Sequence, residues 1–216
     1  MNSNKNSLRT SGILFTLCVL GAAGYGTYAW GQFNIMSFFV TSEGSGNGGD
    51  LGGIDGADTR CQNLATTAGA GNRVWRAYLS TYGEGVEQQA RERIGTGPWY
   101  NAKGVKIAED VTELHINPNI RWDTALDENG DIVPERRHDI LTGTLPDGNV
   151  RSADSPEVMS CDNWTSSSPE HTAIGGHHDR QGGGYTSWNS AHSNDGCSQE
   201  SMVDPNGGLF YCFAAD

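Results

Sequence analysis

The apolar residues of this 216-residue chain come in short runs separated by glycine-rich and polar stretches, so the predicted elements are short. The run 33–41 is followed by the glycine-rich stretch 42–53, which predicts a strand and then a loop. A helix comes next, capped by Asp55 or Asp58 and ended by Gly69. Its apolar residues recur at helical spacing: Ala57, Cys61, Leu64, Ala65 and Ala68.

The middle of the chain alternates short apolar runs with turns. We predict a strand over 74–80, a polar helix over 84–94 that leads into a Gly-Pro turn, and one or two strands between 104 and 114. Residues 122–126 favour a helical turn, and the sequence DENGD at 127–131 is typical of a tight turn.

The last third carries few apolar runs. A strand is expected from Asp139, with a turn at 146–148. A long loop rich in glycine and histidine spans about 169–186, and 187–189 is a short strand or turn. Residues 209–213 predict a closing strand. Few helices, many short strands and long loops together predict an α+β fold.

The N-terminus has the pattern of an export signal. Lys5 and Arg9 precede the apolar run 13–23, which corresponds to the positive and hydrophobic regions of a signal sequence. Cleavage is plausible after Gly24 or after Ala29, because a small residue lies at the third position before each.

The apolar character continues to residue 30, so an uncleaved anchor formed by 13–30 is the alternative to cleavage. We therefore divide the chain into a signal peptide or signal anchor, 1–30, and one domain, 31–216. The expected location is secreted, periplasmic or cell-surface.

Four cysteines follow the predicted signal: Cys61, Cys161, Cys197 and Cys212. An even number behind an export signal predicts disulfides, and none of the four forms a Cys-x-x-Cys pair, which argues against a zinc ribbon or a redox motif. Four cysteines allow three pairings, and spacing alone does not choose among them.

The formal net charge of −12 argues against nucleic acid and anionic membranes as partners, because the long-range force is repulsive. The membrane therefore enters only through the possible N-terminal anchor. Six tryptophans argue against disorder despite the 30 glycines.

Several segments, taken in order, resemble the endostatin domain. The sequence GIDGADTRCQNLATTAGAGNRVWRAYLST resembles its first helix and the Arg-Ala-Phe-Leu-Ser strand that follows. Further similarities are RWDTALDENGDIV, HDILTGTLPDG, CDNWTSSSPEHTAIG and the closing GCSQ and LFYCFA. Together they cover about residues 52–216.

This resemblance implies the C-type-lectin-like fold, with two helices beside a twisted, mostly antiparallel sheet and long loops. It also implies two nested disulfides, Cys61 with Cys212 and Cys161 with Cys197.

The family's metal sites are not carried over. A calcium-dependent lectin has an Asp after its Trp-Asn pair, whereas Trp188-Asn189 is followed here by Ser190. The zinc-binding histidines of endostatin lie at the start of its domain, and residues 33–55 contain no histidine. We therefore expect neither a metal nor another cofactor.

One polar cluster stands out in the predicted loops: residues 176–180, with His138 and Asp139 before them and residues 188–192 after them. The favoured interpretation is structural, with His and Asp side chains fixing turns and Arg180 forming salt bridges. Ligand binding, metal ligation and general-base catalysis are the alternatives, in that order. The candidate ligand-binding residues are His138, Asp139, His177, His178, Asp179, Arg180, Trp188, Asn189 and His192.

Two further patterns have a structural and a functional interpretation. The segment 127–131 begins like a calcium loop but lacks the later glycine and glutamate, which favours a turn with solvated carboxylates. Among the aromatic residues, Trp75 and Trp164 are expected in the core, whereas Trp99 and Trp188 are expected to be exposed.

The leading functional hypothesis is an exported, non-enzymatic recognition module that binds a glycan or an extracellular protein through the loops around 166–196. A metal-dependent hydrolase using the His and Asp cluster is the first alternative, and a structural envelope protein is the second.

Overall fold

The last apolar run of the chain forms the centre of a six-stranded mixed sheet. The order of its main path is β1-β8-β5-β6-β7, and β2 also pairs with β8. All pairs are antiparallel except β5 with β8. The strands are β1 Phe38–Val40, β2 Trp75–Ala77, β5 Asp139–Leu141, β6 Ile174–His177, β7 His192–Ser193 and β8 Leu209–Ala214.

The computed structural model describes residues 35–83, 85–150, 159–180, 187–202 and 206–216. These residues belong to a compact unit, Phe33–Asp216. The predicted signal or anchor, 1–30, lies outside the described residues. The remaining elements are β3 Trp99–Tyr100, β4 Lys106–Ala108, α1 Gly53–Thr67, α2 Ala90–Arg93, α3 Val111–Ile116, α4 Cys161–Trp164 and the 3-10 helices η1 Glu135–Arg137 and η2 Gln199–Ser201.

Strand β8 is buried on both faces, which explains its unbroken apolar sequence. Its alternate residues enter two hydrophobic clusters. Phe210 and Cys212 pack in the cluster that contains α1, whereas Tyr211 and Phe213 pack with Trp99 in the other. The α+β prediction and the closing strand are therefore confirmed.

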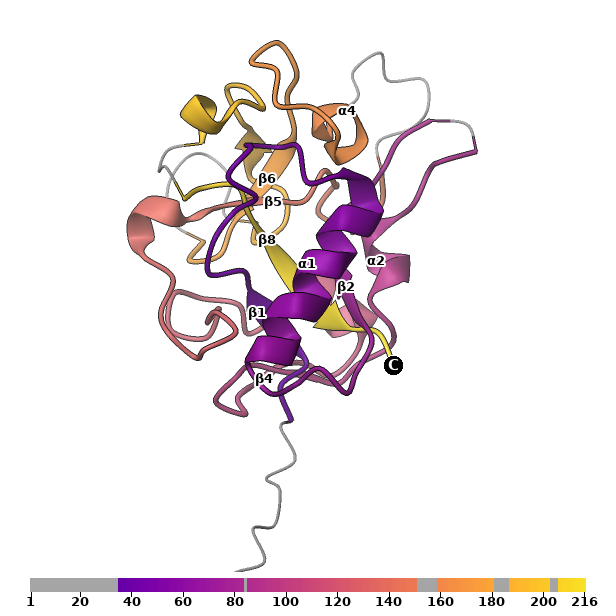
Figure 1. Cartoon of the computed structure of the whole chain (residues 1–216). Coiled ribbons are helices and arrows are strands. Elements are labelled where there is room, and N and C mark those ends of the chain that lie inside the picture. The colour runs from indigo at the N-terminus through magenta and orange to yellow at the C-terminus, as the bar shows by residue number, and fades with distance from the viewer. Residues whose placement is uncertain (1–34, 84, 151–158, 181–186, 203–205) are drawn as a thin grey trace, which may run out of the picture. The chain divides into compact units, whose positions relative to one another are not determined.

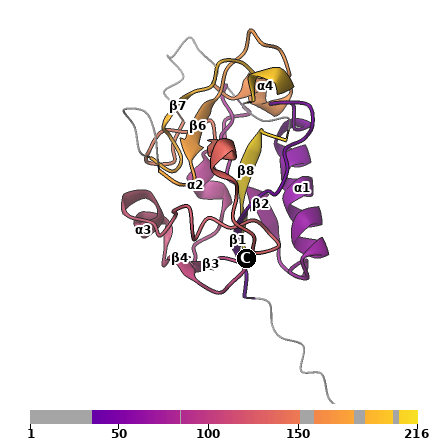
Figure 2. The same cartoon turned by 90° about the vertical axis from the view of Figure 1, so that its left-hand side faces the viewer.

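Helix α1 lies beside β2 and β8 (Figures 1 and 2). Its predicted apolar face is confirmed, since Ala57, Cys61 and Ala65 are buried. The predicted caps are wrong, because the N-cap is Gly52 and Asp58 instead points inward. Gly69 follows the helix with φ of 80°, the left-handed conformation that glycine adopts most easily.

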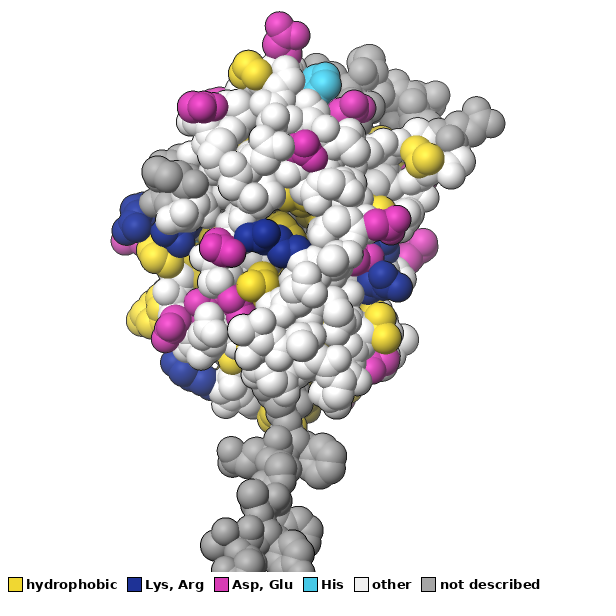
Figure 3. Space-filling view, viewed as in Figure 1, with side chains coloured by type: hydrophobic (Ala, Val, Ile, Leu, Met, Phe, Trp, Pro, Cys, Tyr) yellow, Lys and Arg dark blue, Asp and Glu magenta, His cyan; other side chains and the backbone are white. Residues whose placement is uncertain are grey.

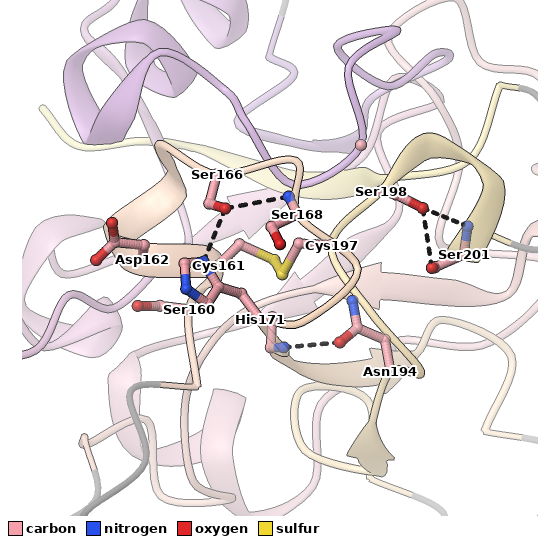
Figure 4. Close-up of a disulfide and its surroundings, with 12 residues drawn as sticks. Ser160, Cys161, Asp162, Ser166, Ser168, His171, Asn194, Cys197, Ser198 and Ser201 are labelled. Atoms are coloured by element: carbon pink, nitrogen blue, oxygen red, sulfur yellow. Dashed lines mark hydrogen bonds between the residues drawn. A yellow bond between two sulfur atoms is a disulfide. The ribbon is translucent and has the colours of Figure 1, made fainter.

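The two disulfides implied by the resemblance are present. Cys61 of α1 bonds to Cys212 of β8, and Cys161 of α4 bonds to Cys197. Polar side chains surround the second bond (Figure 4), where the Ser198 side chain accepts a hydrogen bond from Ser201 N. Two disulfides are typical of proteins that fold in an oxidising compartment.

Three predicted elements differ from the structure. Of the polar helix predicted over 84–94, only Ala90–Arg93 forms a helix, α2, because Gln88 instead pairs with Thr81 in a β-bridge. Residues 111–116 form α3 rather than a strand, because the Asp110 side chain accepts from Glu113 N while Glu113 Oε2 accepts from Glu109 N. Residues 174–177 form β6 inside the predicted long loop. A Cβ at Gly176 would lie 1.8 Å from Trp188 O, so the glycine permits a close backbone approach.

Two of the four tryptophan predictions are confirmed and two are wrong. Trp75 and Trp164 lie in the core as expected. Trp99 and Trp188 are also buried, at 1% and 3% exposure, because both pack against Phe213.

Candidate functional site

Three neighbouring strands bring four of the candidate residues together. Asp139 begins β5 and lies opposite His177, the last residue of β6. His192 begins β7 and pairs with Gly175, two residues before His177. Because alternate residues of a strand share a face, this register puts His192 and His177 on one side of the sheet. The 3-10 helix η1 delivers His138 directly before Asp139.

One carboxylate oxygen is the centre of the cluster. Asp139 Oδ1 lies 3.1 Å from His177 Nε2, 3.3 Å from His192 Nε2 and 3.6 Å from His138 Nε2. The Nε2 atoms of His177 and His192 are 2.9 Å apart. The rings of His138 and His177 stack with their centroids 4.3 Å apart.

The cluster spans the boundary between core and solvent. The side chain of His177 is 3% exposed, whereas those of His138, Asp139 and His192 are 29%, 34% and 44% exposed. Solvent therefore reaches the site from the His192 side, while His177 is held inside the protein.

A backbone carbonyl holds one of the histidine rings, and a buried carboxylate lies near another. His192 Nδ1 lies 2.9 Å from Ser193 O. His138 Nδ1 lies 3.5 Å from Asp179 Oδ2, and the Asp179 side chain is only 1% exposed. A hydrogen bond from an imidazole to a carbonyl fixes both the orientation and the tautomer of the ring, and among these two rings it does so for His192.

His178 is buried beside this cluster rather than exposed. Its backbone N–H donates to His138 O. Among the described residues, neither of its ring nitrogens has a hydrogen-bond partner. Burial lowers the pKa of His178 to about 4, so its ring is neutral at physiological pH.

Three other candidate residues lie outside the cluster. Arg180 Nη2 donates to Pro118 O. Trp188 is in the core, and Asn189 is fully buried with its side-chain amide donating to Tyr78 Oη. The candidate set therefore separates into a histidine and aspartate cluster and residues with structural contacts.

A small pocket adjoins the cluster, with a cavity volume of about 30 Å³. Asp139 and His192 contribute to its wall, together with Asn194. Arg136 and Arg137 add positive charge, and the apolar lining comes from Ile140, Leu141 and Met202. The pocket thus combines hydrogen-bond donors, acceptors and an apolar surface.

The sequence interpretation did not select Arg136, Arg137 or Asn194. Arg136 and Arg137 directly precede His138, so their place beside a histidine was a usable signal. Asn194 had none, because only the pairing of β7 with β6 brings it to the pocket.

Comparison with known proteins gives no further guide to the site. No model of a known protein family matches the chain, and no curated protein matches it. Within the described ranges, no helix has the length and apolar character needed to cross a membrane.

The acidic turn at 127–131 is structural in its contacts. Its turn geometry is confirmed by the bond from Gly130 N to Asp127 O. The expected solvated carboxylates are found only at Asp131, which is exposed, because Asp127 and Glu128 are buried. Asp127 Oδ1 accepts from the N–H groups of Asn129 and Asp131, and Glu128 accepts from Ser42 N and Oγ.

Proposed function

We propose that this protein is an exported, non-enzymatic recognition module that binds a glycan. The observation that carries the proposal is the set of groups around the pocket beside the histidine cluster. Because the cavity of about 30 Å³ admits only a group about the size of one water, we expect a sugar to lie on the surface over it and to place one hydroxyl group inside. The pocket presents a carboxylate, an imidazole, an amide and two guanidinium groups next to an apolar lining. Sugars are recognised by such combinations, because their hydroxyl groups need donors and acceptors while their C–H faces need apolar contacts.

The scaffold supports the same proposal. The pocket is built on β5, β6 and β7, and a disulfide joins α4 to the segment that follows β7. Rigid elements position binding groups more accurately than free loops do. We also propose that the α+β domain is of the C-type-lectin-like class, on the ordered resemblance to endostatin domains between residues 52 and 216.

The surface charge is consistent with an uncharged ligand rather than a polyanion. On the face shown in Figure 3, acidic and basic side chains are interspersed, and the basic side chains visible there form no continuous stripe. The net charge of −12 repels polyanions at long range.

A glycan microarray probed with the labelled full chain tests the proposal, with hits quantified by calorimetry. Arg136→Ala removes an exposed guanidinium at the pocket and should weaken binding at least about tenfold, since hydrogen bonds to charged groups contribute about 1.5–3 kcal/mol.

The matched control is Arg121→Ala, which removes an exposed arginine paired with Asp123 away from the pocket lining. It should bind like the unchanged protein. A chain that binds no glycan on the array overturns the glycan proposal, and binding to an extracellular protein partner would then replace it. If Arg136→Ala bound the glycan as tightly as the unchanged protein, the pocket would not be the binding site.

A metal-dependent hydrolase is the second candidate, because three imidazoles and a carboxylate converge beside an accessible pocket. Zinc-dependent cleavage of simple ester or peptide substrates, lost in Asp139→Asn, would establish it. A zinc-loaded protein without such activity would remove it.

A further inference from the structure

The carboxylate of Asp139 faces imidazole nitrogens without the hydrogen bonds that its position would allow. Its Oδ1 atom is buried and lies 3.1–3.6 Å from three Nε2 atoms. Within the described part of the chain it has no hydrogen-bond partner. A buried carboxylate oxygen left in this way is costly, so the arrangement needs an explanation.

The tautomer of His192 sharpens the question. Its Nδ1 lies 2.9 Å from Ser193 O, and a carbonyl oxygen can only accept, so Nδ1 carries the hydrogen. In a neutral imidazole the other nitrogen then holds a lone pair. That lone pair, on Nε2, lies 3.3 Å from Asp139 Oδ1, which is also an acceptor.

Two acceptors at this distance repel each other unless a positive charge lies between them. A proton on His192 Nε2 is one source, but a single N–H cannot serve both neighbours. His192 Nε2 is 2.9 Å from His177 Nε2 as well as 3.3 Å from the carboxylate oxygen. A cation coordinated by all these atoms satisfies them together.

The spacing suits a transition-metal ion. Nitrogen and oxygen ligands about 2.0–2.1 Å from a tetrahedral zinc ion lie about 3.3 Å from one another. His177 Nε2 and His192 Nε2 lie 2.9 Å apart, and Asp139 Oδ1 lies 3.1–3.6 Å from the three Nε2 atoms. One ligand atom from each of His138, Asp139 and His177 falls in a group whose members all lie within 4.8 Å of one another.

The surroundings also match those of metal-bound histidines. Such histidines commonly present their second nitrogen to a carboxylate or a backbone carbonyl. Here Ser193 O lies 2.9 Å from His192 Nδ1 in a hydrogen bond, and the carboxylate of Asp179 lies 3.5 Å from His138 Nδ1 without a hydrogen bond between these two atoms. The donor set of three imidazoles and one carboxylate favours zinc or a neighbouring transition metal over calcium, which takes six or more oxygen ligands.

We propose that His138, Asp139, His177 and His192 bind a divalent transition-metal ion of the zinc class. This site goes beyond the proposed glycan recognition, which a different residue, Arg136, tests. The exposed side of the site, at His192, gives the ion a route from solvent.

The test uses the full chain, purified from an oxidising compartment without a histidine tag and stripped with a chelator. Zinc is titrated against a chromophoric chelator, and cobalt(II) is added separately to record its visible spectrum. We expect one zinc per chain and the intense visible bands of four-coordinate cobalt.

Two variants address the ligands. His192→Ala removes the most exposed ligand, and Asp139→Asn removes the negative charge with little change of shape. Each should weaken zinc binding by about 100-fold or more and abolish the cobalt bands, because a direct ligand contributes more than the 10–100-fold typical of groups behind it.

The control is His171→Ala, an exposed histidine outside the cluster whose Nδ1 contacts Ser166 Oγ at 2.7 Å (Figure 4). It should bind zinc like the unchanged protein. Near-UV circular dichroism checks that each variant is folded. Absence of stoichiometric zinc in the folded protein, or unchanged affinity in both His192→Ala and Asp139→Asn, overturns the proposal.

Discussion

Two aspartates in this domain differ in their hydrogen-bond partners. Asp58 on α1 is buried, and its two oxygens accept from Arg76 at 2.8 Å, from Arg93 at 2.7 Å and from Ala77 N at 2.8 Å. Asp139 on β5 also has a buried oxygen, Oδ1. Among the described residues this oxygen lies near imidazole nitrogens but accepts no hydrogen bond.

The difference separates a structural carboxylate from one in a site. Asp58 ties α1 to β2 and α2, and its charge is neutralised by two arginines, so nothing further is needed. Asp139 lacks such partners at Oδ1, and a bound cation would supply the missing positive charge. Asp58 therefore stabilises the packing of α1, whereas Asp139 belongs to the metal site that we propose.

The largest expected effect on stability comes from the disulfides, one of which joins α1, the helix of Asp58, to β8, while the other joins α4 to the segment that follows β7. Replacing Cys61 and Cys212 together with Ala opens a link across 151 residues and should cost about 5 kcal/mol, against about 4 kcal/mol for Cys161 and Cys197, which are 36 residues apart. The reason is the larger entropy that the longer loop regains in the unfolded chain.

Urea unfolding of both double variants measures the two costs. We expect loss of the first disulfide to weaken the whole domain. A smaller loss for Cys61 and Cys212 than for Cys161 and Cys197 would contradict the loop-length account.

The aspartates themselves sharpen the comparison. Asp58→Asn leaves Arg93, 11% exposed, without its counter-charge and should lower the free energy of unfolding by about 3 kcal/mol. Asp139→Asn in the metal-free protein should change it by less than about 1 kcal/mol, because no hydrogen bond to Oδ1 is lost.

Urea unfolding with a chelator present compares the two variants directly. Equal destabilisation would show that Asp139 is as much a structural residue as Asp58. In the presence of zinc, only Asp139→Asn should lose a zinc-dependent gain in stability.

The smallest effect concerns pH and lies outside the cluster. Tyr78 Oη lies 2.8 Å from His115 Nε2, and burial lowers the pKa of His115, with nearby Arg91 also lowering it and Asp147 opposing. Since the folded form keeps this ring neutral, its contribution to stability is present above about pH 6.5 and is lost as the pH falls toward the lowered pKa.

The decrease in unfolding free energy between pH 7 and pH 5 should therefore be less steep in His115→Gln than in the unchanged protein. Urea titrations at both pH values, with a chelator present, measure the difference between the two slopes. Identical slopes would mean that His115 titrates alike in the folded and unfolded chains.

Much of the scaffold was predictable from sequence because it depends on local periodicity. The helix face of Ala57, Cys61 and Ala65 and the closing strand followed from apolar spacing alone. Helix α3 was missed although Asp110 and Glu113 carry a capping signal, because short apolar runs do not distinguish strand from helix. The glycines of β6 hid that strand for a similar reason, since glycine is depleted in strands.

The candidate site was predictable only in part. The histidine and aspartate residues were visible as a polar cluster, but Trp188 and Asn189 beside them proved to be buried. No local signal distinguishes an exposed Trp-Asn pair from one that packs on Phe213 and Tyr78, because that depends on which strand lies underneath.

The sequence by itself determined the short apolar runs, the α+β class and the presence of disulfide-forming cysteines, since each depends on residue type and near spacing. Only the tertiary structure decided that His138, His177 and His192 meet at Asp139. Their meeting depends on the register of β5, β6 and β7, which backbone hydrogen bonds between distant segments fix and which a shift of one residue would reverse.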